Sequence, residues 1–281
     1  MKLFLPVVFA VLAASCAPAP AKRVPEKVAE APASAPSPAE PSLVVKALRP
    51  GIWMHTSFSP DAARFPSNGL IFREGGHVVL LDTAWGDAVT EELLGWIARE
   101  VRLPVSYAVI THAHEDRMGG AAALARHNIP MVGHPLTRTR ALARGWSAPK
   151  AVEDFSTGDV ARLGFLEIYF PGPAHSPDNV VVWVASERLL YGGCAVKAMD
   201  ASELGNVADA DRRRWPGALL RITERYPATR IVVPGHGKAG GPELIAHTRQ
   251  LLAGKPSGLP WASAGTAPAR TRAAADIALN R

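Results

Sequence analysis

The sequence predicts an α/β fold with helices on the outer faces of its sheets. Two observations support this prediction. Short runs rich in β-branched and other apolar residues alternate with segments of helical periodicity, and the strand-then-helix order occurs twice along the chain. These segments fall between about residues 43 and 253, so this part of the chain is expected to form the globular core.

The individual elements follow from local patterns. A strand pair is expected at residues 69–72 and 77–82, because both runs are apolar and the turn-forming segment Glu74-Gly75-Gly76 separates them. Apolar residues spaced three or four apart predict the helices, whereas short buried runs predict the strands. Further strands are expected at 105–111, 166–170, 179–185, 188–192 and 230–233, and helices at 90–101, 120–127, 211–226 and 242–252.

Length and composition allow one domain of roughly 200 residues with tails. The chain has 281 residues, of which 48% are apolar, and a formal net charge of +6. The basic residues are spread out and form no basic helix interleaved with aromatic residues. The charge therefore indicates a mildly basic surface rather than a nucleic-acid interface. No long apolar stripe is left over, which favours a monomer.

The N-terminus resembles an export signal. Met1-Lys2 precedes an apolar stretch at residues 3–14, which is too short to span a bilayer as a stable helix. The segment Leu12-Ala13-Ala14-Ser15-Cys16 resembles a bacterial lipobox, in which the cysteine is lipidated. Ala17 favours the outer membrane, by resemblance to lipoprotein sorting signals. An ordinary secretory signal is the alternative. Either one predicts a periplasmic protein, and only the lipobox predicts a membrane contact, through a lipid on Cys16.

Segments of low complexity flank the core. Residues 17–42 are rich in Ala and Pro and have too little apolar surface to offset their ordering entropy, so a flexible linker is expected. A similar composition predicts a disordered tail at 254–281. The predicted division is thus a signal at 1–16, a linker at 17–42, a domain at 43–253 and a tail. Cys16 and Cys194 sit in contexts that explain each separately, so a disulfide between them is not favoured.

The segment at residues 111–120 is the sharpest chemical feature of the sequence. His112, His114 and Asp116 occupy alternate positions between a predicted buried strand and a predicted helix. Their side chains can converge if the segment is extended or tightly looped, whereas a helix would separate His112 from His114. Neutral imidazole and carboxylate are zinc ligands, so a metal site is predicted. A solvated histidine-rich loop is the alternative.

Three further ligand types follow predicted strands. His175 lies in a turn-rich loop between two strands, and Cys194 and His236 each stand just past a strand. Sites in α/β sheets collect at strand ends, and a cysteine near zinc is held as thiolate. Each residue alone has an ordinary structural explanation, but together they indicate a metal centre. The remaining histidines are expected to be surface or core residues: His55, His77, His127, His134 and His247.

These motifs resemble those of the class B metallo-β-lactamases, subclass 1, and are most similar to the VIM-like carbapenemases. The resemblance extends from about residue 51 to residue 252. It rests on Pro66-Ser67-Asn68-Gly69-Leu70-Ile71, Leu81-Asp82-Thr83-Ala84-Trp85, the HxHxDR segment, the His175 loop, Gly192-Gly193-Cys194, Gly205-Asn206-Val207-Ala208-Asp209-Ala210-Asp211 and Pro234-Gly235-His236-Gly237. It implies a metallo-β-lactamase fold, which is an αββα sandwich of two mixed β-sheets with helices on the outer faces. It also implies hydrolysis of small-molecule β-lactam antibiotics by metal-bound hydroxide.

The resemblance further implies two Zn²⁺ ions per chain. His112, His114 and His175 would bind the first ion. Asp116, Cys194 and His236 would bind the second. Superfamily hydrolases such as glyoxalase II resemble an HxHxDH pattern, with a bridging aspartate where Cys194 stands here. Arg117 and Cys194 therefore separate this chain from thioester and lactone hydrolases.

Roles in catalysis and substrate binding are implied for residues around the metals. Asp116 would help to orient the attacking hydroxide, and the Asn206 amide would stabilise the developing oxyanion. Lys197 would pair with the carboxylate of the substrate. Phe65 and Trp85 would form an apolar wall over the metals, and Asp82 and Arg117 would orient ligands beneath the second zinc.

Two alternatives stay open from the sequence. One is another zinc hydrolase of the same fold that acts on a thioester or a lactone, against which Arg117 and Cys194 argue. The other is a non-catalytic surface lipoprotein, which would be expected to have lost ligands, although all six are present. No serine-nucleophile motif is found, so no covalent acyl-enzyme is expected.

Overall fold

A seven-stranded sheet forms the N-terminal half of the fold in the computed structural model, which describes residues 40–152, 155–254 and 275–276. Neighbouring strands pair antiparallel from β1 to β4 and parallel from β4 to β7. Tight turns suffice for antiparallel neighbours, whereas the parallel strands need crossover segments. In sheet order the strands are β1 (Leu43–Arg49), β2 (Ile52–Phe58), β3 (Pro66–Glu74), β4 (His77–Leu81), β5 (Val105–Ile110), β6 (Met131–Gly133) and β7 (Lys150–Ala151).

A second, six-stranded sheet contains most of the C-terminal half. It is also mixed, because β12 and β13 pair parallel to their neighbours and the other strands pair antiparallel. In sheet order the strands are β12 (Ile231–Pro234), β11 (Leu189–Gly193), β10 (Val181–Val184), β9 (Leu166–Tyr169), β8 (Val160–Leu163) and β13 (Ala275–Asp276). Strand β13 belongs to the predicted tail, and most of that tail lies outside the described residues, as do the predicted signal and all but the last three residues of the predicted linker.

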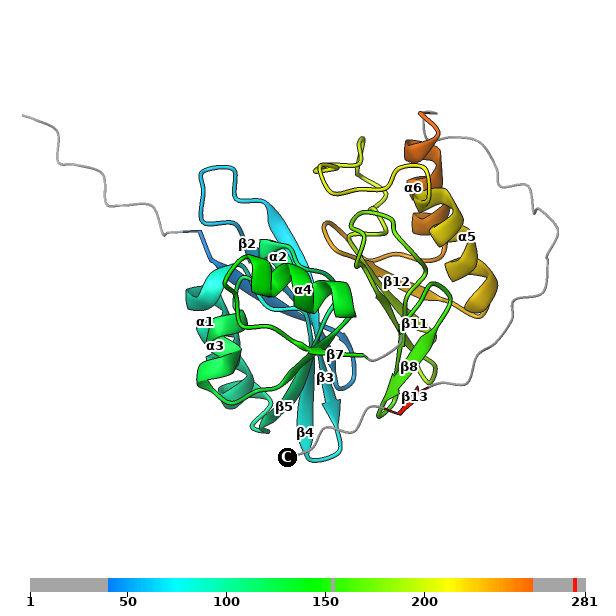
Figure 1. Cartoon of the computed structure of the whole chain (residues 1–281). Coiled ribbons are helices and arrows are strands. Elements are labelled where there is room, and N and C mark those ends of the chain that lie inside the picture. Colours follow the sequence, from blue (N-terminus) through cyan, green and yellow to red (C-terminus); the bar gives the residue numbers. More distant parts are fainter. Residues whose placement is uncertain (1–39, 153–154, 255–274, 277–281) are drawn as a thin grey trace, which may run out of the picture. The chain divides into compact units, whose positions relative to one another are not determined.

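Helices cover the outer face of each sheet (Figure 1). On the first sheet, α1 and α3 pack through apolar side chains such as Leu93 and Leu124. On the second sheet, α5 and α6 pack through side chains such as Leu219 and Ile245. The helices are α1 (Gly86–Glu100), α2 (Glu115–Met118), α3 (Ala121–Arg126), α4 (Pro135–Ala143), α5 (Trp215–Arg225) and α6 (Glu243–Leu252). None of the described helices is both long and apolar enough to cross a membrane.

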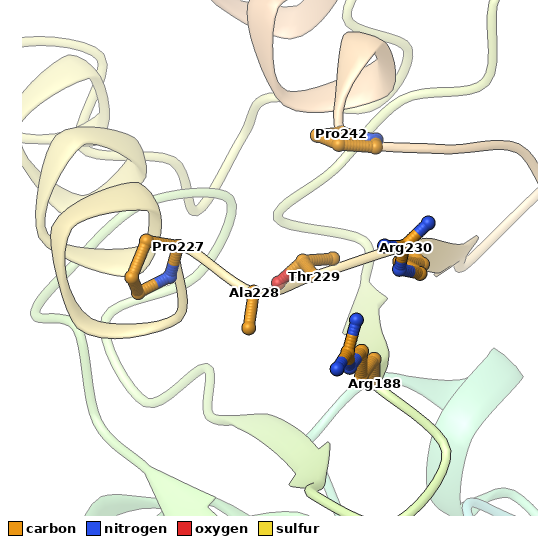
Figure 2. Close-up of a pocket in the computed structure, with 6 residues that line it drawn as sticks. All are labelled: Arg188, Pro227, Ala228, Thr229, Arg230 and Pro242. Atoms are coloured by element: carbon orange, nitrogen blue, oxygen red, sulfur yellow. The ribbon is translucent and has the colours of Figure 1, made fainter.

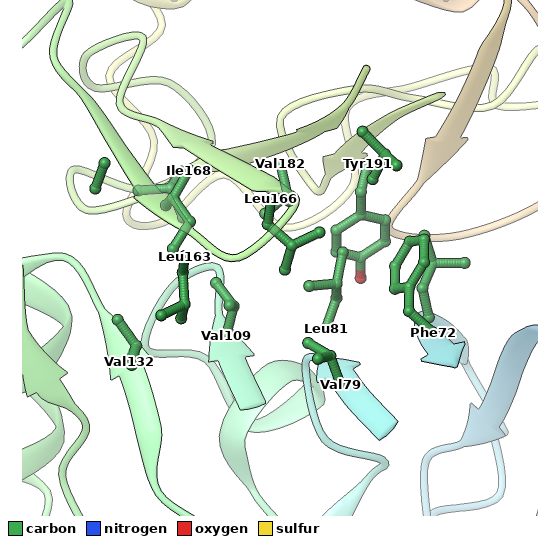
Figure 3. Packing of buried hydrophobic residues seen from close by; sticks show 14 of the residues in the cluster. Phe72, Val79, Leu81, Val109, Val132, Leu163, Leu166, Ile168, Val182 and Tyr191 are labelled. Carbon is green, nitrogen blue, oxygen red and sulfur yellow. The ribbon is translucent and has the colours of Figure 1, made fainter. Parts of the chain in front are cut away.

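A central apolar layer joins the two sheets (Figure 3). Successive side chains of a strand point to opposite faces, so one strand serves two layers. Val79 and Leu81 of β4 enter the central layer, whereas Val78 and Leu80 face the helices. On the second sheet, Val182 enters the central layer. Two mixed sheets with helices outside therefore form the predicted αββα sandwich, and this prediction is confirmed.

The predicted elements differ from the observed ones mainly at their ends. The helix expected at 90–101 begins at Gly86, and the one expected at 211–226 begins at Trp215. The elements that were not predicted are the strands β1, β2, β6, β7, β8 and β13 and the helices α2 and α4. The sequence of α4 is PLTRTRALA, with a low apolar content that marks no apolar stripe. Only contacts with the rest of the fold reveal that it is a helix.

Gly69 lies on β3 directly opposite His55 of β2. A Cβ atom at this position would stand 2.1 Å from His55 Nε2 and 2.5 Å from the Leu81 carbonyl oxygen. We expect Gly69→Ala to lower the free energy of unfolding by about 1–3 kcal/mol, because buried neighbours cannot make room. Gly76→Ala, where a Cβ would meet nothing within 4 Å, should change it by about 1 kcal/mol or less. Urea unfolding of both variants measures the difference, and equal effects would contradict this packing.

Candidate metal centre

Three histidine rings converge at one edge of the sandwich. His112 Nε2 lies 3.1 Å from His114 Nδ1, and His175 Nε2 lies 3.2 Å from the same atom. The rings stand nearly perpendicular to one another, with interplanar angles of 77–86°. Three ring nitrogens therefore face one point, which we call the first cluster.

Local folding explains this convergence. Residues 112–114 form a bend after β5, and helix α2 begins only at Glu115. Because of this bend, the side chains of His112 and His114 point to the same side of the chain. Residues at alternate positions can converge in this way only when the segment is not helical. Asp116 lies on α2 and turns away from the first cluster. Its carboxylate joins a different set of residues.

Asp116, Cys194 and His236 form the second cluster. His236 Nε2 lies 3.3 Å from both Asp116 Oδ2 and Cys194 Sγ, and the sulfur lies 3.6 Å from that carboxylate oxygen. Cys194 and His236 follow the parallel strands β11 and β12, whose carboxyl ends meet at this edge. Gly235 permits the close approach, since a Cβ there would stand 2.7 Å from Cys194 Sγ.

Both clusters fit zinc. A tetrahedral zinc with bonds of about 2.0–2.1 Å holds its ligand nitrogens roughly 3.3–3.4 Å apart, close to the separations in the first cluster. Nitrogen, thiolate and carboxylate are the donors that zinc prefers, and within each cluster the ligand atoms lie within 4.8 Å of one another. Facing ring nitrogens leave lone pairs that a cation would satisfy. The clusters are therefore suited to a metal ion rather than to mutual hydrogen bonding alone.

Burial and neighbouring charges set the protonation of these ligands. Burial holds the pKa values of His112 and His175 well below the usual range, which keeps their nitrogens free to bind a metal. Burial alone would also lower the pKa of His236, but Cys194 and Asp116 raise it to about 9. The negative charge near His236 therefore favours its protonated form over the neutral one.

Arg117 supports the second cluster from beneath. Its guanidinium is fully buried and lies 2.8 Å from Asp116 Oδ2. It also donates to the carbonyl oxygens of Asn68 and Gly235 and to the Tyr191 hydroxyl. Although burial opposes it, Arg117 holds the pKa of Asp116 well below its usual range. The structure thus places Arg117 next to Asp116 of the second cluster.

Asp82 lies one step further from the ligands. Its carboxylate accepts hydrogen bonds from Thr111 N at 2.7 Å and from the Tyr191 hydroxyl at 2.8 Å, and Arg117 is 3.5 Å away. Burial raises its pKa to about 6, against the opposing effect of Arg117. Asp82 therefore reaches the ligands through the backbone that precedes His112 and through Arg117, rather than by touching a ligand side chain.

The predicted substrate-binding residues occupy different environments. Lys197 is buried, with Nζ 5.6 Å from the centre of the Trp215 ring, and burial lowers its pKa. Asn206 is exposed, and its Oδ1 accepts a hydrogen bond from Ala208 N within its own loop. Phe65 is 60% exposed just before β3. Trp85 is partly buried at the start of α1, where its backbone N donates to Ser57 Oγ.

Two residues near the first cluster escaped the sequence analysis. Asp209 Oδ2 lies 2.9 Å from His114 Nε2, on the side of the ring opposite the cluster. A carboxylate in this place orients a metal-binding imidazole. Trp215 packs its ring edge to face with His175, with centroids 5.8 Å apart. Asp209 belongs to the segment at 205–211 that carried part of the resemblance, but its partner could not be identified from local sequence.

The other five histidines lie outside both clusters, as expected. His55 and His247 are buried, whereas His127 is exposed and pairs with Glu91. The pocket in Figure 2 also lies apart from the clusters and contains none of the six candidate ligands. Its lining residues are Arg188, Pro227, Ala228, Thr229, Arg230 and Pro242.

Arg117→Met should destabilise the fold strongly, because it leaves Asp116 and Asp82 buried without their cation. Breaking a buried ion pair from one side costs about 3–5 kcal/mol. Arg126 also pairs with two carboxylates, those of Asp87 and Glu91, but at an exposed site, so Arg126→Met should change the free energy of unfolding far less. Urea unfolding with a chelator present compares the two variants. If Arg117→Met lowered the free energy of unfolding no more than Arg126→Met does, the supporting role of Arg117 would be refuted.

Comparison with known proteins adds an independent finding. A family model described as "Metallo-beta-lactamase superfamily" matches residues 62–236. A metallo-beta-lactamase type 2 from Bacillus cereus is 35% identical over 218 residues, covering 75% of this chain and 83% of that protein. The protein of the same name from Bacteroides fragilis is 37% identical over 188 residues, covering 66% and 75%.

Solved structures agree with these relatives. A metallo-beta-lactamase from Pontibacter korlensis is 41% identical, with a TM-score of 0.71, over 76% of this chain and all of that one. FIM-1 from Pseudomonas aeruginosa, solved in a mono-zinc form, is 34% identical, with a TM-score of 0.73, over 77% of this chain and 97% of that one. Because the family model spans more than half of the chain and the relatives exceed 30% identity, the protein belongs to the metallo-β-lactamase superfamily.

Proposed function

We propose that this protein is a zinc-dependent β-lactamase that hydrolyses the amide bond of β-lactam antibiotics. The observation that supports this most is the second cluster, in which Cys194 and Asp116 converge with His236 above the buried Arg117. Relatives at 35–37% identity carry the name metallo-beta-lactamase type 2. We further propose that the chain falls into subclass 1, because it combines Cys194 with Arg117, and that it accepts carbapenems.

Two zinc ions are proposed, one for each cluster. Bound zinc supplies an activated water at neutral pH and polarises a carbonyl group. His112, His114 and His175 would hold the first ion. The three residues of the second cluster would hold the other. One solved relative is described in a mono-zinc form, and a metal count on the purified protein tests the proposed two ions per chain.

Residues of the chain position the substrate and the water in this proposal. Asp116 is kept ionised by Arg117, and its second carboxylate oxygen can accept a hydrogen bond from the water and so orient it. The Lys197 ammonium, which lies over the Trp215 ring, would attract the carboxylate of the substrate. The Asn206 amide on its exposed loop would donate to the lactam carbonyl oxygen. Phe65 and Trp85 would cover apolar parts of the substrate.

The alternatives are less well supported. A thioester or lactone hydrolase of the same fold would resemble the HxHxDH pattern, and this chain has Arg117 after Asp116. A non-catalytic lipoprotein would have no need to keep six ligands converged in two clusters.

We also propose that the protein is exported to the periplasm and anchored through a lipid on Cys16. The support is the apolar stretch at 3–14 and the small residues before the cysteine.

Hydrolysis of a carbapenem and of a penicillin by the purified protein, followed by absorbance, tests the proposed reaction. Activity should disappear with a chelator and return with added zinc. His175→Ala should reduce the rate by at least about 100-fold. Mutating a residue that only contacts a metal ligand typically reduces activity about 10–100-fold, and removing a ligand itself should reduce it more. His127→Ala, at an exposed histidine, is the matched control and should leave the rate unchanged. No turnover of any β-lactam by the zinc-loaded protein would exclude the β-lactamase function.

A further inference from the structure

Helix α4 carries an arginine that lies between two carboxylates beside the first cluster. A terminal nitrogen of Arg140 donates to Asp209 Oδ2, and Arg140 Nε lies 3.6 Å from Asp178 Oδ1. Its side chain is 23% exposed, so these contacts form in a partly dry environment. Arg140 is not one of the candidate ligands, and neither the motifs nor the predicted site residues include it.

The first contact connects Arg140 to a ligand. Asp209 Oδ2, which accepts from Arg140, is also the atom 2.9 Å from His114 Nε2. The opposite nitrogen of the same ring, Nδ1, faces His112 and His175 in the first cluster. A carboxylate on the outer nitrogen fixes both the tautomer and the orientation of an imidazole. The position of Asp209 therefore controls where His114 Nδ1 points.

The second contact connects Arg140 to the backbone that carries the ligands. Asp178 is fully buried, and its Oδ2 accepts from Ala113 N at 2.8 Å, between His112 and His114. Its Oδ1 accepts from the hydroxyl of Ser176, the residue after His175. One carboxylate thus holds the two segments that contain all three ligands. Arg140 is the cation that faces both this carboxylate and Asp209.

We propose that Arg140 is a positioning residue for the first metal ion: it holds Asp209 against His114 and balances the charge of Asp178. The proposal rests on the proposed function, because it takes the first cluster to be a metal site. Arg144 cannot fully replace it, since Arg144 lies 3.9 Å from Asp209 and is more exposed. Without Arg140, Asp209 and Asp178 would be left as neighbouring anions, and Asp209 would turn towards solvent.

A positioning role and a purely electrostatic role predict opposite results. Removing a positive charge near a metal site should strengthen cation binding if only the charge matters. Removing a positioning residue should weaken binding instead, because His114 loses its fixed orientation. The sign of the change in metal affinity therefore distinguishes the two roles. A residue that only anchors the loop would lower the melting temperature without changing the affinity.

The test is a zinc titration of the full protein against a chromophoric chelator, with Arg140→Leu, Arg140→Lys, Asp209→Asn and the double variant R140L/D209N. Arg140→Leu should weaken binding of the ion at the first cluster by about 10-fold, at the low end for an outer partner. Arg140→Lys should restore most of the affinity. The double variant should lose less affinity than the sum of the two single losses, because part of the effect of Arg140 passes through Asp209. Arg230→Leu, at an exposed arginine on the pocket of Figure 2, is the matched control and should behave as the unmodified protein does.

Cobalt substitution separates the two clusters. The thiolate-to-cobalt absorption reports the second cluster, which contains Cys194, and it should be the same in every Arg140 variant. Unchanged or tighter binding in Arg140→Leu, or additive losses in the double variant, would overturn the role of Arg140 alone. If the unmodified protein bound no zinc, the proposed zinc site itself would fail, and the role of Arg140 with it.

Discussion

The fully buried guanidinium of Arg117 is the interaction on which the rest of the site depends. It is surrounded by acceptors from both halves of the sandwich: Asp116 and the Asn68 carbonyl on one side, and the Gly235 carbonyl and Tyr191 hydroxyl on the other. A buried cation is tolerated only when it is paired and fully hydrogen-bonded, so these groups are held in one arrangement. That arrangement brings the end of β12, and with it His236, against the helix that carries Asp116.

At the edge of the sandwich the two sheets are therefore joined by directional hydrogen bonds between polar groups. In the centre they are joined by apolar packing, which has no directional preference. Asn68 on β3 shows how the edge is joined: its backbone N donates to the Gly235 carbonyl, and its side-chain amide donates to the carbonyl oxygens of Pro234 and Gly237. Packing of the central layer alone would allow the sheets to slide by small distances. Directional hydrogen bonds at the edge fix the register to the precision that metal ligands need.

Each cluster has its own arginine and carboxylate support, with different chemistry. Beneath the second cluster, Arg117 contacts the ligand Asp116 directly and keeps it ionised. Beside the first cluster, whose candidate ligands are imidazoles, Arg140 contacts a carboxylate that in turn contacts His114. An anionic ligand can be paired with a cation directly, whereas a neutral imidazole needs an intervening acceptor. The two arrangements follow from the ligand types.

Local sequence determined the periodic elements and the candidate ligands of this protein. The unbroken apolar run of β4 and the apolar stripe of α1 reflect which faces are buried, and five of the six candidate ligands stand in segments that follow strands, whereas Asp116 stands on α2. Tertiary structure alone decided the roles of α4, Asp209 and Arg140. The sequence of α4 carries no apolar stripe, and the partners of Asp209 lie 69 residues away at Arg140 and 95 residues away at His114. Residues so far apart meet only because the two sheets pack together, and no local pattern records that packing.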